Sequence, residues 1–130
     1  MKLPAFGIDL ITMFPLGFVA TVTAGGRPNV SPKGTFLVLD DRTLAFGEIR
    51  SPQTVTNLTN QPELEVNFVD QWTRKGVRVR GKAQMVRRGT AEFGGLTEQL
   101  KPISTPPYDD GATEEDMIAT FNAKFAETYP

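Results

Sequence analysis

GGRPNVSPKGTFLVLDDRTLAFGEIRS, residues 25–51, is the stretch that decides the fold. It predicts a turn with two glycines, two antiparallel strands joined by a second turn, and then the start of a helix. The first strand, expected over Asn29–Leu39, contains Pro32, which cannot donate a hydrogen bond to a neighbouring strand. We therefore expect an edge, a bulge or a kink at Pro32, and Gly34 leaves the backbone open to close approach there.

The end of this stretch has the features of an anion-binding site. Ser51 is a favourable helix N-cap, and Pro52 stands at the favoured first helical position. The first turn of a helix presents unpaired N–H groups and the positive end of the helix dipole, which suit a phosphate. Arg50 adds a cation and Ser51 a hydroxyl beside the main-chain N–H groups near Thr54. The turn into this helix is therefore predicted to hold a phosphate.

The flanking sequence predicts a mostly β (α+β) protein, built as a small antiparallel barrel or roll with helices at its edges. Alternating apolar and polar residues predict further strands over residues 16–23, 43–46, 63–69 and 76–86. Helices are expected over residues 1–15, 51–60 and from 90 toward 100. Another helix is expected after Thr113, because Met117, Phe121 and Phe125 recur with the i, i+4 spacing.

Composition restricts the chemistry of the chain. Its 130 residues are expected to form a single domain over residues 1–130. The absence of Cys and His excludes disulfides, thiol nucleophiles, Ser-His-Asp arrangements and most transition-metal sites. An enzyme with this composition needs a bound cofactor, and no metal is expected. No apolar run reaches the roughly 20 residues of a membrane span and no signal peptide is recognisable, so a cytoplasmic protein without membrane contact is expected.

The strand expected over residues 76–86 carries a row of cations, Arg78, Arg80 and Lys82, on one face. A net charge of -1 and a pI of about 5.4 argue against nucleic acid as a partner, as does the lack of aromatic residues between the cations. The row is either a solvated strand face or, in a dimer, a surface that reaches a partner's site.

Taken in order, these segments resemble the pyridoxamine 5′-phosphate oxidase-like family of FMN-binding split β-barrels. The resemblance is carried by LGFVATVTAGGRPNVSPKGTF (16–36), LAFGEIRSPQTVTNLTNQPELEVNFVD (44–70) and TRKGVRVRGKAQMV (73–86), and it covers roughly Leu16 to Arg88. The resemblance implies a small antiparallel split β-barrel with flanking helices, which forms a homodimer with FMN at the subunit interface. It also implies an oxidoreductase that acts on a small-molecule substrate, here unassigned because the family's substrate-phosphate residues do not match.

The resemblance also implies the site residues. Ser31, Pro32, Lys33, Gly34 and Thr35 would lie along the isoalloxazine ring, and Ile49, Arg50, Ser51 and Thr54 near the phosphate. Lys33 is the candidate cation for the side of the ring that bears negative charge when reduced. A salt bridge or a surface position is the equal alternative for Lys33. No catalytic residue is identified.

The chain departs from the best-known members of this family in two places. Where those members have a Ser-Arg-Lys run at the helix start, this chain has Pro52, Gln53 and Thr54. Either Arg50 supplies the missing charge or FMN binds weakly. The segment from Gly94 to Ser104 is also too short for the extra strand that relatives have there, so either the barrel closes differently or a segment is missing from the chain.

These departures leave a second function open, namely a non-catalytic dimeric split-barrel module. Such a module has either lost FMN or binds a flavin or deazaflavin only as a sensor. Haem-binding relatives share the barrel, but the usual haem ligand is a His and the chain has none, so haem is the least expected cofactor.

Overall fold

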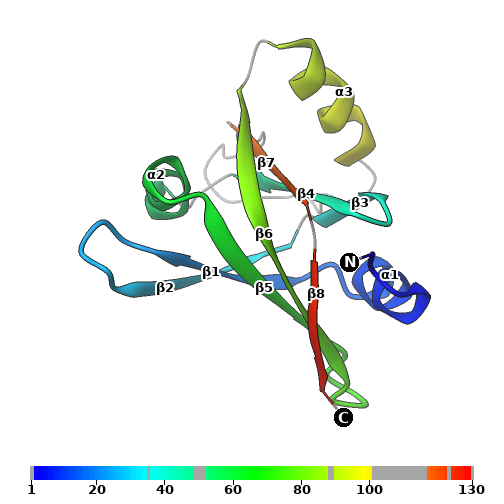
Figure 1. Cartoon of the computed structure of the whole chain (residues 1–130). Helices are drawn as coiled ribbons and strands as arrows, with labels where there is room; N and C mark the ends of the chain where they lie inside the picture. The colour runs from blue at the N-terminus through cyan, green and yellow to red at the C-terminus, as the bar shows by residue number, and fades with distance from the viewer. Residues whose placement is uncertain are drawn as a thin grey trace, which may run out of the picture.

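The computed structural model describes residues 2–34, 36–48, 52–87, 90–100, 117–122 and 124–129. Its helices are α1 (Ala5–Met13), α2 (Pro52–Asn60) and α3 (Ala91–Leu100). Its strands are β1 (Gly17–Val22), β2 (Pro28–Lys33), β3 (Phe36–Asp40), β4 (Thr43–Glu48), β5 (Glu63–Val69), β6 (Gly76–Arg87), β7 (Met117–Asn122) and β8 (Lys124–Tyr129). The strands form antiparallel ladders with the helices at their margins, so the predicted α+β split-barrel class is confirmed (Figure 1).

The sheet is organised around β6. The strand order is β2-β1-β5-β6-β7-β4-β3, and β8 also pairs with β6. One edge of β6 pairs with β5, and the other edge pairs with β7 and then β8 in succession, from Ala83↔Phe121 to Arg80↔Lys124. The 12-residue β6 therefore runs through both halves of the sheet (Figure 1).

The expected single strand over Asn29–Leu39 is instead two strands. β2 pairs with β1 at one end of the strand order, and β3 pairs with β4 at the other. Thr23 N–H donates to the Arg27 carbonyl at 2.9 Å, so odd-numbered residues of β1 exchange hydrogen bonds with β2. Pro32 stands opposite Phe18, at a non-bonded position of an edge strand where no N–H is required. The predicted edge at Pro32 is thus confirmed, and in the described residues the sheet stays open between β2 and β3.

The prediction of a helix after Thr113 is wrong. Met117–Asn122 and Lys124–Tyr129 are strands, and β7 pairs with β4 and β6 on its two edges. The i, i+4 spacing of Met117 and Phe121 also fits a strand, because every second residue shares a strand face. Pairing on both edges decides between the two. β7 and β8 supply two strands beyond Gly94–Ser104, and the expected strand over residues 29–39 is divided in two. The described part of the chain therefore has eight strands rather than the five expected.

The core lies between the sheet halves and is closed on one side by α1. Phe36 and Phe46 have ring centroids 5.2 Å apart, and Phe36 meets Phe68 edge-on at 4.6 Å. A Cβ added at Gly17 would lie 2.5 Å from Phe36, so only glycine fits beneath these rings. Ile11 of α1 is fully buried against this cluster. None of the helices in the described ranges is long and apolar enough to cross a membrane.

Candidate functional site

The predicted site residues that the structure describes lie on two elements. Ser31, Pro32 and Lys33 end β2, Gly34 follows directly, and Thr54 is the third residue of α2. Lys33 is only 5% exposed, which excludes the surface position considered for it. Thr35, Ile49, Arg50 and Ser51 lie outside the described residues, so their assignment stays a prediction.

Thr54 has the most informative environment of these residues. Its side chain is 1% exposed, and its Oγ1 has no hydrogen-bond partner among the residues that the structure describes. Buried hydroxyls are nearly always hydrogen-bonded, and leaving one unpaired costs about 1–3 kcal/mol. This hydroxyl lies in the first turn of α2, where main-chain N–H groups also lack helical partners. The arrangement presents donors to an anion at the start of α2.

A polar network centred on the buried side chains of Asn57 and Thr21 links α2 to β1 and β2. Gln53 Nε2 donates to Asn57 Oδ1 at 2.7 Å, and Asn57 Nδ2 donates to Thr21 Oγ1 at 2.9 Å. Asn29 Nδ2 of β2 reaches the same Thr21 oxygen at 3.5 Å. Asn57 is 1% exposed and lies one helical turn after Thr54, on the same buried face. The network therefore ties the helix of the predicted phosphate site to the strand of the predicted ring site.

Sequence reasoning missed this network. A signal for half of it was present, because Gln53 and Asn57 stand four residues apart and such pairs meet on a helix surface. Thr21 carried a weaker signal, since it is a polar residue on the same face of β1 as Val19, which is fully buried. Only the tertiary structure brings the two signals together.

Two of the three cations in the row on β6 share a single carboxylate of β5. Glu65 contacts Arg80 at 2.8 Å and Arg78 at 3.4 Å. Lys82, the third cation, has no ion pair within the described residues. Among these residues no group of three or more Asp and Glu side chains is placed to hold a metal ion.

A family model described as pyridoxamine 5′-phosphate oxidase matches residues 9–124. The chain belongs to the pyridoxamine 5′-phosphate oxidase family. This membership confirms the resemblance inferred from residues 16–88 and extends it over most of the chain. No curated protein sequence matches the chain.

Three solved structures illustrate the range of functions among similar folds. A candidate pyridoxamine 5′-phosphate oxidase from Lactobacillus delbrueckii is similar at a TM-score of 0.78 and 20% identity, over 99% of this chain and 94% of the other. The haem storage protein HutZ from Vibrio cholerae is similar at 0.74 and 20%, over 99% and 94%. An F420 reductase is similar at 0.73 and 20%, over 95% and 98%. At these identities the likeness shows the fold alone.

Proposed function

We propose that this chain is an FMN-binding flavoprotein that acts as a homodimeric oxidoreductase on a small-molecule substrate. The observation that carries the proposal is the buried hydroxyl of Thr54 in the first turn of α2, which has no hydrogen-bond partner within the described part of the chain. A terminal phosphate would accept a hydrogen bond from it and from the adjacent main-chain N–H groups. FMN, when bound, supplies the hydride and electron chemistry that a chain without His or Cys lacks.

Residues at the start of α2 and at the end of β2 support this cofactor. Thr54 and the α2 N–H groups would hold the phosphate, and the sequence adds Arg50 and Ser51, which lie outside the described residues. The main chain at the end of β2 would lie along the ring, where Gly34 has no heavy atom within 4 Å of an added Cβ and so leaves space for a flat group. Lys33, buried at the same end of β2, would place a cation beside the ring.

Two other cofactors occur among the similar folds and are ranked by the chemistry of this chain. Haem is disfavoured, because the chain has neither a His nor a Cys to bind the iron. A deazaflavin is the second candidate, since an F420 reductase shares the fold and such a cofactor also carries a phosphate.

The decisive experiment compares ligands by titration of the purified protein. We expect flavin absorption in the protein as purified or tight binding of FMN on addition, with riboflavin, which lacks the phosphate, binding much more weakly. Equal affinity for FMN and riboflavin would remove the phosphate site. Binding of F420 but not FMN would select the deazaflavin, and binding of neither by a dimeric protein would favour the non-catalytic module. Turnover with NAD(P)H and a dye separates an enzyme from a sensor.

The oligomeric state is tested separately by light scattering. We expect a dimer at micromolar concentration, because in the proposed arrangement both chains contact each cofactor. A monomeric mass for the FMN-loaded protein would contradict a shared site.

A further inference from the structure

The ladder between β1 and β5 opens into a fork. The two strands pair from Gly17↔Phe68 as far as Ala20↔Glu65. Beyond that pair each strand continues, but only with its other neighbour, as Val22↔Pro28 and Glu63↔Lys82 show. The ends of β1 and β5 therefore lie beside each other without forming the next rung of the sheet.

The alternation of hydrogen-bonded and non-bonded pairs in the neighbouring ladders shows which main-chain groups face the fork. Ala83 N–H donates to the Pro62 carbonyl at 2.8 Å, so even-numbered residues of β5 bond to β6 and Glu63 directs its N–H and C=O toward β1. Odd-numbered residues of β1 bond to β2, so Val22 directs its N–H and C=O toward β5. In a continued ladder Val22 and Glu63 would form the next bonded pair. Within the described residues the groups that face the fork have no other hydrogen bond.

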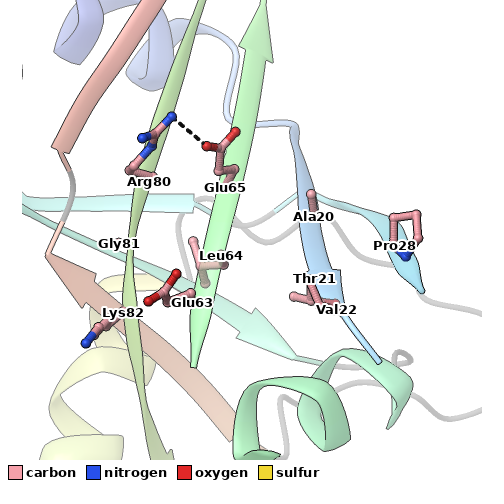
Figure 2. A pocket seen from close by; sticks show the side chains of 10 residues that line it. All are labelled: Ala20, Thr21, Val22, Pro28, Glu63, Leu64, Glu65, Arg80, Gly81 and Lys82. Atoms are coloured by element: carbon pink, nitrogen blue, oxygen red, sulfur yellow. Dashed lines mark ion pairs between the residues drawn. The ribbon is translucent and has the colours of Figure 1, made fainter. Parts of the chain in front are cut away.

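A pocket of about 600 Å³ occupies this fork. This volume is within the range of about 300–1,000 Å³ that is usual for ligand sites. Its apolar walls come from Ala20, Val22, Pro28 and Leu64, on three different strands (Figure 2). The pocket thus joins apolar walls to a short length of unpaired strand backbone.

Of the four charged side chains that line the pocket, two form an ion pair with each other and two have no ion pair with any described residue. Glu65 and Arg80 neutralise each other at 2.8 Å (Figure 2). Glu63 and Lys82 stand opposite each other in the β5–β6 ladder, and neither has an ion pair within the described residues. The pocket therefore offers one carboxylate and one ammonium to a ligand, beside the backbone groups of Val22 and Glu63.

We propose that this fork is a binding site for a short, extended peptide with free termini. The amide groups of such a peptide match the unpaired main-chain groups of Val22 and Glu63, as in the addition of a strand to a sheet. Its ammonium matches the Glu63 carboxylate, and its carboxylate matches the Lys82 ammonium. The site is formed by β1, β2, β5 and β6, and none of its lining residues is among those of the proposed flavin site.

The test uses trialanine as the probe and the full-length protein, by two-dimensional ¹⁵N–¹H NMR. We expect saturable shifts centred on the amides of Val22 and Glu63. Acetylation of the peptide's amine or amidation of its carboxylate should each weaken binding about two- to fivefold, the size of a partly exposed ion pair. Glu63→Gln should abolish the effect of acetylation, and Lys82→Gln the effect of amidation. The matched control Lys75→Gln, in the exposed β5–β6 turn, should leave both effects intact.

Three outcomes would overturn the proposal. The first is the absence of saturable shifts at Val22 and Glu63. The second is a response to capping that Glu63→Gln and Lys82→Gln leave unchanged, since the two charges would then play no part. The third is that the amide signals of Val22 and Glu63 shift with protein concentration but not on addition of peptide. This result would mean that a second copy of the chain covers the fork.

Discussion

Thr54→Val separates two effects that the buried hydroxyl of Thr54 combines. In the protein without cofactor, the change replaces an unpaired buried hydroxyl by a methyl group of the same shape. Since an unsatisfied buried hydroxyl costs about 1–3 kcal/mol, the free energy of unfolding should rise by about that amount. Helix propensity contributes little, because Val and Thr have nearly the same value. Thr54→Val should therefore stabilise the protein without cofactor, although Thr54 belongs to the proposed phosphate site.

The same substitution should weaken FMN binding. A hydrogen bond to a charged group contributes about 1.5–3 kcal/mol, so the dissociation constant for FMN should increase about 10- to 150-fold. Affinity for riboflavin should not change, because riboflavin has no phosphate to accept the bond. Urea unfolding of the apo protein followed by circular dichroism gives the stability, and quenching of flavin fluorescence gives the two affinities.

Thr56→Val is the matched control, since Thr56 is exposed on the same helix. It should change neither stability nor FMN affinity appreciably. Destabilisation of the apo protein by Thr54→Val would mean that the hydroxyl has a partner in the folded chain. A more stable protein with unchanged FMN affinity would mean that the hydroxyl is buried for another reason and that the phosphate binds elsewhere.

Three further predictions concern the scaffold. Asn57→Ala should lower the free energy of unfolding by about 1–3 kcal/mol, because it breaks the buried hydrogen bond from α2 to Thr21 of β1 and a partly buried one to Gln53 within α2; denaturant unfolding measures it. Gly17→Ala should destabilise by about 1–3 kcal/mol through overpacking, whereas Gly94→Ala should stabilise by about 0.5–1 kcal/mol because Gly94 lies inside α3 with open space around it. Partial loss of hydration raises the pKa of Asp70, but hydrogen bonds from Trp72 and Thr73 together lower it by more. The pKa of Asp70 is therefore below the ordinary 3.8. The contribution of this carboxylate to stability should therefore be complete above pH 3.8 and lost as the pH falls through the lower folded value, which Trp72 fluorescence reports.

Each of these predictions has a contrary outcome. Asn57→Ala should lower the free energy of unfolding more than Asn60→Ala, which changes an exposed residue of the same helix. Equal losses in the two variants would contradict the role of the network. Stabilisation by Gly17→Ala would mean that the rings of Phe36 and Phe68 can move aside at little energetic cost. A Trp72 transition that persists unchanged in Asp70→Asn would assign the acid transition to another group.

Local patterns predicted those parts of the fold in which one interaction dominates. Strict alternation placed Glu63–Val69 within β5, and the proline at position 52 marked the start of α2. The pattern was ambiguous at Met117 and Phe121, because their spacing fits one face of a helix and one face of a strand equally well. Pairing with β4 and β6 decided the matter, and that information lies far away in the sequence.

Some features of the candidate site likewise follow from local sequence, and others depend on the fold. The phosphate-binding character of the α2 start follows from residues that are neighbours in the chain. The burial of Lys33 and Thr54 does not, because it depends on what packs over them. The ion pairs of Arg78 and Arg80 with Glu65 likewise depend on the register between β5 and β6.

The position of β7 between β4 and β6 has a consequence for how the chain is made. More than half of the 130 residues separate Leu44 from its partner Phe121, so β4 emerges from the ribosome long before the strand that completes it. During that interval one edge of β4 and the facing edge of β6 have no partner, and such edges template aggregation. Contacts of this separation also slow folding, because the loop must close before the contact forms. The sheet is therefore completed only after β7 has been synthesised, and until then the unpaired edges of β4 and β6 are open to pairing with other chains.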